Sequence, residues 1–183
     1  AVVPASDRFE ILASRRHGAV DAVLLAMRRL DIAGLLAARP CREANLVMAM
    51  LAARILAPHT KLATTRWWHG QTLAEELDLV DADENDLYGA MDWLLERQEA
   101  IERKLAARHL ASGGLALFDL TSSYLEGRCC PLAARGYSRD GKKNKLQINW
   151  GLLTDRRGCP VAAAVFKGNT ADSMTLLPQM RRL

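Results

Sequence analysis

The stretch that decides the fold runs Leu115-Ala-Leu-Phe-Asp119-Leu-Thr121-Ser122-Ser123-Tyr124. Its apolar start predicts a buried strand that ends at Asp119, because buried strands read as continuous apolar runs. In such sheets ligands collect beyond the strand ends, and a carboxylate there is usually paired, hydrogen-bonded or bound to a metal. A second interpretation stays open, in which Asp119 only accepts hydrogen bonds from Thr121 or Ser122 in a local turn.

The chain upstream of this stretch has the apolar spacing of helices. A domain boundary is expected at Ser112-Gly113-Gly114, which gives a helical region over residues 1–112. Thr72-Leu-Ala-Glu75 has the spacing of a capping box, and Asp83 to Asp86 place negative charge where the macrodipole favours it. The helices are expected over residues 18–30, 31–39, 43–56, 60–69, 72–77 and 83–110.

The chain downstream, residues 113–183, predicts a sheet and one helix. A long connection over 122–144 leads to an alternating, half-buried strand at 146–152. Asp155-Arg-Arg-Gly158 predicts a hairpin turn, and the partner strand from Pro160 to Phe166 is apolar enough to need cover on both faces. A helix is expected from Asp172 or Ser173 to Met180. The fold class is therefore α+β, with the sheet domain looking cut short after one helix.

Composition excludes several classes of protein. Half of the 183 residues are hydrophobic and a quarter are charged, as in ordinary globular domains. The sequence has no run of about 18 apolar residues, so we expect no membrane contact. The four cysteines form no C-x-x-C pair and are interpreted as reduced thiols of a cytoplasmic protein. The four histidines show no paired ligand spacing and are interpreted as surface or helix-end residues.

Positive charge is concentrated just after the Asp119 stretch. Between residues 128 and 157 the chain has eight basic and two acidic residues, a net +6, whereas the whole chain has a net charge of +4. Gly136 to Lys143 partly matches a phosphate loop, but Lys143 stands where Ser or Thr is needed and a strand follows, so no nucleotide cofactor is expected. The side chains of Arg139, Lys142, Lys143 and Lys145 either contact a nucleic-acid backbone or form a solvated charged loop.

Several ordered blocks resemble the bacterial insertion-sequence transposases of the IS-four-like superfamily. The likeness covers nearly the whole chain, since it includes helical segments as well as the sheet region. The blocks are His59-Thr-Lys-Leu-Ala-Thr64, Leu87-Tyr-Gly-Ala-Met-Asp-Trp-Leu-Leu95, Phe118-Asp-Leu-Thr-Ser-Ser-Tyr-Leu-Glu-Gly127, Gly136-Tyr-Ser-Arg-Asp-Gly-Lys142, Leu146-Gln-Ile148, Gly151-Leu-Leu-Thr-Asp155, Gly158-Cys-Pro-Val161 and Phe166-Lys-Gly-Asn-Thr-Ala-Asp172.

The resemblance implies a helical DNA-binding region over 1–112 and an incomplete ribonuclease-H-like catalytic domain over 113–183, with its first three strands and first helix. Asp119 matches the first residue of the family's Asp-Asp-Glu triad, so it is the expected catalytic and metal-binding residue. The other two carboxylates are expected beyond residue 183. Two Mg²⁺ or Mn²⁺ ions are expected only in the complete site.

The function implied is metal-dependent cleavage and strand transfer at transposon ends, with double-stranded DNA and a homo-oligomer as expected partners. This chain carries one catalytic Asp, so on its own we expect it to be inactive. The alternative is a catalytically inactive DNA-binding remnant of a decayed element.

Overall fold

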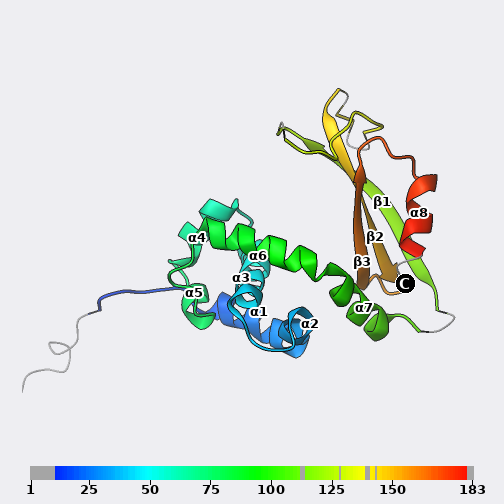
Figure 1. The fold of residues 1–183 in the computed structure, drawn as a ribbon. Helices are drawn as coiled ribbons and strands as arrows, with labels where there is room; N and C mark the ends of the chain where they lie inside the picture. The colour runs from blue at the N-terminus through cyan, green and yellow to red at the C-terminus, as the bar shows by residue number, and fades with distance from the viewer. Residues whose placement is uncertain (1–10, 112–113, 128, 139–140, 143, 181–183) are drawn as a thin grey trace, which may run out of the picture. The chain divides into compact units, whose positions relative to one another are not determined.

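The computed structural model describes residues 11–111, 114–127, 129–138, 141–142 and 144–180 (Figure 1). Its internal contacts divide the chain into two units, Ala1–Gln98 and Glu99–Leu183. The structure belongs to the α+β class, with eight helices and three strands in the described residues. The boundary falls earlier than the expected one at residues 112 and 113, so the last predicted helix is shared between the units.

The first unit, called here the helical unit, consists of short helices. The expected helices are all present, with ends that differ by a few residues from the sequence pattern. They are α1 (Gly18–Arg29), α2 (Ile32–Leu36), α3 (Arg42–Leu56), α4 (Lys61–Trp68), α5 (Leu73–Glu76) and α6 (Glu84–Glu96).

The core of the helical unit is apolar and closely packed. Trp68 of α4 and Leu87 of α6 are fully buried, and α3 contributes buried residues along most of its length. Fully burying side chains of this size contributes about 1.5–3 kcal/mol each. The other fully or nearly fully buried members are Val20, Leu24, Val47, Ala49, Ala52, Ala53, Leu73, Leu79 and Ala90.

The helix caps differ in part from the sequence pattern. Thr72 makes no capping hydrogen bond, because its Oγ1 is 2.8 Å from His17 Nδ1. The capping box lies instead at α6, where the Asp83 carboxylate accepts from Asp86 N and the Asp86 carboxylate accepts from Asp83 N. A carboxylate in this position satisfies amides that a helix start leaves unpaired.

The long helix expected over 83–110 is two helices, because the chain breaks at Arg97 between α6 and α7 (Gln98–His109). The guanidinium Nη1 of Arg97 donates to the Trp93 carbonyl at 3.0 Å, and the Arg97 backbone N–H donates to Leu94 O instead. The guanidinium also lies 4.0 Å from the centre of the Trp93 ring. The Arg97 side chain thus takes the acceptor that its own backbone would use in a continuous helix.

The second unit, called here the sheet unit, contains α7, an antiparallel sheet and α8 (Ser173–Met180). Its strands are β1 (Ala116–Leu125), β2 (Leu146–Asp155) and β3 (Pro160–Lys167), in the order β1-β2-β3. β2 and β3 form a hairpin whose turn ends at Gly158, with φ of +83°. That backbone conformation favours glycine, which has no Cβ to clash.

The two faces of the sheet differ, and the buried face of β2 carries its polar side chains. Gln147 and Asn149 are buried, whereas Trp150 is 39% exposed. The amides are buried because they hold loops: Gln147 Nε2 donates to Tyr137 O and Gly168 O, and Asn149 Nδ2 donates to Thr170 O. The alternation therefore predicts the strand correctly, while the usual rule of apolar side in and polar side out fails.

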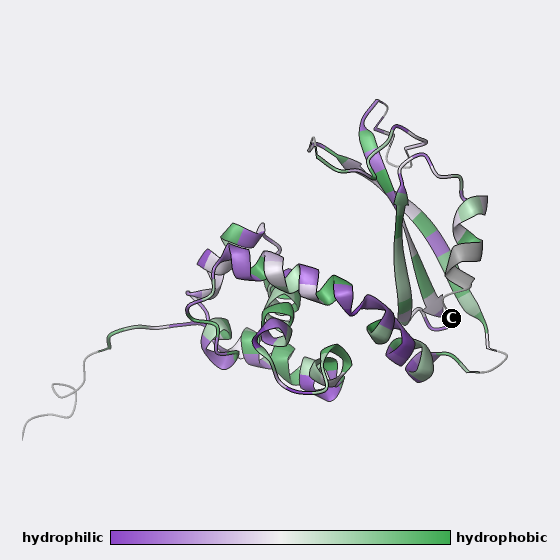
Figure 2. Ribbon diagram, in the orientation of Figure 1, coloured by the Kyte–Doolittle hydropathy of each residue, from purple (hydrophilic) through white to green (hydrophobic). Residues whose placement is uncertain are grey.

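Val161 and Ala162 at the start of β3 are both buried, but from Ala162 to Val165 the strand is covered on one face only, so the expectation of cover on both faces is wrong for most of the strand. Ala162 and Ala164 are buried, whereas Ala163 is exposed and Val165 is 55% exposed. Figure 2 shows hydrophobic residues along β3 and mostly hydrophilic ones along α7, in which no residue is buried. Glu102 of α7 accepts a hydrogen bond from Ala163 N at 3.1 Å, so α7 lies at the outer edge of β3.

No single helix in the described residues is long and apolar enough to cross a membrane. One pair, α3 with α4, reaches the length and hydropathy together, but the two helices bend by 88° at the break between them. Most of α3 is buried in the core of the helical unit.

Candidate functional site

Asp119 lies within β1, because the strand continues to Leu125 instead of ending at Asp119. Its side chain is exposed, and Oδ1 accepts a hydrogen bond from the neighbouring Leu120 N at 2.9 Å. In the turn interpretation, Asp119 would accept hydrogen bonds from Thr121 or Ser122; among the described residues it accepts one from Leu120 N instead. Within the described parts of the chain, no Lys, Arg or His pairs with Asp119. The carboxylate is therefore available to a ligand from outside these residues.

Asp119 belongs to a face of the sheet that we call the open face. Opposite residues of an antiparallel pair share a face, and Asp119 is opposite Leu152. Several large apolar side chains of this face are well exposed, among them Leu117 at 47%, Trp150 at 39% and Val165 at 55%. The open face comprises Leu117, Asp119, Thr121, Ser123, Leu125, Leu146, Ile148, Trp150, Leu152, Thr154, Ala163, Val165 and Lys167.

Asp119 is the one carboxylate on the open face within the described residues. Glu126 follows the end of β1 and pairs with Lys145 Nζ at 3.3 Å. Asp155 is opposite Ala116 and lies on the buried face, and Asp172 immediately precedes α8. A site for two metal ions needs several carboxylates around ions about 4 Å apart. The described residues therefore do not form such a site by themselves.

The connection between β1 and β2, residues 126–145, is called here the basic segment, and its described lysines lie beside the Leu125 end of β1. Lys142 Nζ is 5.7 Å from the centre of the Tyr124 ring, and Lys145 pairs with Glu126. Tyr124 is five residues from Asp119, which corresponds to about 17 Å along a strand. Arg139 and Lys143 lie outside the described residues. The structure thus brings Lys142 and Lys145 together, but places both well away from Asp119.

Two glycines and Gln147 fix the path of the basic segment. Ala134 and Gln147 exchange two backbone hydrogen bonds of 3.0 Å, and Gly168 N donates to Leu132 O. A Cβ on Gly168 would lie 1.9 Å from Gln147 O, and one on Gly136 would lie 2.1 Å from Gly168 O. Only glycine allows such close backbone approach. The segment is thus anchored to the sheet at Gln147, a role that the sequence pattern did not indicate.

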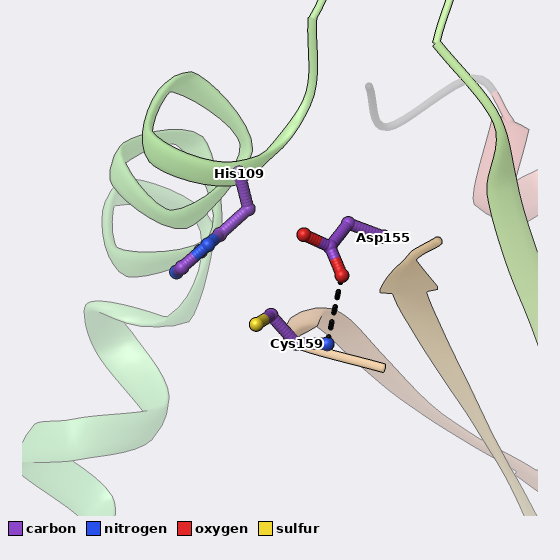
Figure 3. Close-up of side chains that lie close together, drawn as sticks. All are labelled: His109, Asp155 and Cys159. Carbon is purple, nitrogen blue, oxygen red and sulfur yellow. Dashed lines mark hydrogen bonds between the residues drawn. The ribbon is translucent and has the colours of Figure 1, made fainter. Parts of the chain in front are cut away.

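A second cluster joins His109, Asp155 and Cys159, as Figure 3 shows. His109 is the last residue of α7, Asp155 ends β2 and Cys159 precedes β3, and one ligand atom from each lies within 4.8 Å of the others. The Asp155 carboxylate accepts from Arg157 N at 2.8 Å, Cys159 N at 2.9 Å and Arg157 Nε at 3.0 Å. Arg157 Nη2 is also 3.4 Å from His109 Nδ1.

The environment of Asp155 favours its charged form. Burial by itself would raise the pKa, but the hydrogen bonds from Cys159 N and Arg157, with the Arg157 charge, outweigh it and lower the pKa of Asp155 to about 2. The same contacts raise the pKa of Arg157. Sequence reasoning interpreted His109 and Cys159 as unconnected residues, because they meet only through the packing of α7 against the hairpin.

Comparisons of the chain with protein-family models, with curated proteins and with solved structures found no match. The resemblance to transposases stays an expectation from the ordered sequence blocks.

Proposed function

We propose that this chain is the front part of a metal-dependent DNA transposase of the Asp-Asp-Glu type, with Asp119 as the first of the three carboxylates. The observation that carries the proposal is an exposed Asp119, with no ion-pair partner among the described residues, on the first strand of an antiparallel β1-β2-β3 sheet that is followed by a helix. This order of elements is the one expected for the start of a ribonuclease-H-like domain. In the described part of the chain no strand pairs with the outer edge of β1, where the further strands of that fold would add.

Mg²⁺ or Mn²⁺ would stabilise charge on a phosphodiester and activate the attacking hydroxyl in the complete site. The described residues supply one carboxylate where two ions need several, so we assign no catalytic step to this chain alone. Asp119 would serve as one metal ligand once the remaining two carboxylates are present.

We also propose that the basic segment contacts the phosphate backbone of double-stranded DNA. Lys142 and Lys145 lie beside the end of β1, and Tyr137 is 84% exposed, so its ring is available to stack or pack against a nucleotide. Each phosphate contact releases condensed counterions, so the affinity should fall steeply with added salt.

The binding test compares two exposed basic residues at opposite ends of the sheet. Lys142→Ala should weaken binding of a DNA duplex and reduce the slope of log K against log salt by about 1. Arg156→Ala, in the turn between β2 and β3, removes the same charge and should leave the slope unchanged. Fluorescence anisotropy over a series of salt concentrations measures both. Equal effects of the two variants, or binding that is insensitive to salt, would contradict the DNA contact.

The catalytic test needs a chain that supplies all three carboxylates. In such a chain, Asp119→Ala should abolish Mg²⁺-dependent cleavage of transposon ends and leave end binding largely intact. Thr121→Ala, two residues along the same face, is the control and should retain cleavage. Metal-dependent cleavage by the Asp119 variant would show that the assignment is wrong.

A second function is favoured by the open face, which carries a single carboxylate among the residues that the structure describes. In this alternative, residues 1–183 act as an inactive DNA-binding remnant. Both functions predict DNA binding by this chain, and neither predicts cleavage by it alone. An open reading frame that continues past the codon for Leu183 to a further Asp and Glu supports the transposase, and a stop codon there supports the remnant.

A further inference from the structure

We propose that His109, Asp155 and Cys159 form a binding site for a divalent transition-metal ion, with Zn²⁺ as the expected ion. One ligand atom from each residue lies within 4.8 Å of the other two. The three side chains come from the end of α7 and the two sides of the β2–β3 turn, and they meet around one point in Figure 3. The site is on the buried side of Asp155 and does not depend on the transposase proposal.

The ligand types select the class of ion. Imidazole nitrogen, thiolate sulfur and carboxylate oxygen are the three donors that zinc sites use. A thiolate favours Zn²⁺ or Co²⁺ over Mg²⁺, which prefers oxygen ligands and keeps its waters. The site is therefore chemically distinct from the one expected at Asp119. Three protein ligands leave a fourth position for water in tetrahedral geometry.

The backbone of the hairpin holds two of the ligands in fixed positions. Asp155 N donates to Cys159 O at 3.0 Å, and Cys159 N donates to Asp155 Oδ1 at 2.9 Å. Asp155 Oδ1 thus accepts from the backbone N–H groups of Arg157 and Cys159, whereas Oδ2 accepts from Arg157 Nε. Ligand atoms around tetrahedral zinc lie about 3.4–3.7 Å apart, so the cluster must close by roughly an ångström. The proposal requires the Cys159 and His109 side chains to rotate by this amount.

Arg157 occupies the position that a metal ion would take. Its Nε donates to Asp155 Oδ2 at 3.0 Å and its Nη2 lies 3.4 Å from His109 Nδ1. The Arg157 side chain is 63% exposed, so it can move into solvent without leaving a cavity. On binding, the Cys159 thiol releases its proton to water, a metal–sulfur bond forms, and the guanidinium leaves Asp155 Oδ2. Arg157 is therefore a competitor for the site and not a ligand.

The experiment titrates the full chain with CoCl₂ and with ZnCl₂ under reducing conditions, and compares four variants. Co²⁺ bound to Cys159 should give a thiolate-to-cobalt charge-transfer absorption, and Zn²⁺ should displace it. Cys159→Ser should remove that absorption and weaken Zn²⁺ binding by at least about tenfold. His109→Gln should weaken Zn²⁺ binding by at least the same factor. Cys130→Ser makes the same chemical change outside the cluster and should have no effect.

Arg157→Gln gives the outcome that separates a metal site from a hairpin turn held by an ion pair. If the site binds metal, removing the competing cation should tighten Zn²⁺ binding, and Zn²⁺ should raise the Tm of this variant more than that of the unaltered chain. Circular dichroism checks that each variant is folded. Absence of a thiolate–cobalt absorption in both the unaltered chain and the Arg157→Gln variant would overturn the proposal. An absorption that survives Cys159→Ser would overturn it as well.

Discussion

The helical unit and the sheet unit bury different kinds of side chain. The core of the helical unit is made of Trp68, Leu87, Val47 and similar apolar residues, although Ile55 of α3 and Leu95 of α6 stay exposed. The sheet unit buries Gln147, Asn149 and Asp155 on one face and exposes apolar side chains on the other. In the helical unit, stability comes mainly from the hydrophobic effect, whereas the covered face of the sheet also depends on hydrogen bonds that hold two loops.

The largest expected effect is that of Trp68→Ala in the helical unit. Trp68 is fully buried, so truncation should lower the free energy of unfolding by about 3–5 kcal/mol. Urea unfolding followed by circular dichroism at the helical minimum measures this. Trp68→Phe should be milder, because the ring volume is largely kept and the buried Nε1, which has no partner among the described residues, is removed. An equal loss of unfolding free energy in both variants would show that this core does not depend on a large side chain at position 68.

The next largest effect is expected in the sheet unit, from Gly168→Ala. The added Cβ would meet the backbone oxygens of Gln147 and Ala134, so the free energy of unfolding should fall by about 3 kcal/mol. Gly89→Ala in α6 is the matched control. Nothing lies within 4 Å of its Cβ, and a helical alanine should stabilise the chain by up to about 1 kcal/mol. Thermal unfolding of both variants measures the contrast, and a stable Gly168→Ala variant would show that the loop is not anchored as described.

The smallest effect concerns Asp155 and appears only in acid. The pKa of Asp155 in the folded chain is about 2, below its value of about 3.9 in an unfolded chain. The charged carboxylate therefore contributes stability that is fully present above pH 4 and is lost as the pH falls from about 4 to about 2. Asp155→Asn should flatten this part of a plot of Tm against pH. Arg157→Gln should flatten it in part, since the Cys159 N–H bond remains. An unchanged acid limb in Asp155→Asn would contradict the assigned pKa.

The sequence predicted the order of elements well, because periodicity reports which side chains an element can cover. It missed features that depend on one side chain. At the break between α6 and α7 the Arg97 side chain donates to the Trp93 carbonyl, and Thr72 is bonded to His17 instead of capping α5. No periodicity encodes either contact.

The candidate site was predicted in part. Asp119 was singled out by an apolar run that ends in a carboxylate, yet the strand continues past it, because Thr121, Ser122 and Ser123 fit a strand as well as a turn. The basic segment is close to Asp119 in sequence but not in space, because the second half of β1 lies between them. The cluster of His109 with Asp155 and Cys159 was missed, because its first member comes from a different element.

The loop between β1 and β2 has a consequence for the order in which the sheet forms. β2 and β3 are joined by four residues, 156–159, whereas residues 126–145 must close before β1 can pair with β2. The difference in loop length costs roughly 1.4 kcal/mol of additional chain entropy. We therefore expect the β2–β3 hairpin to acquire protection first in pulse-labelled hydrogen exchange, and β1, with Asp119, to join the sheet last. The strand that carries the candidate catalytic residue would then be the latest part of the sheet to form.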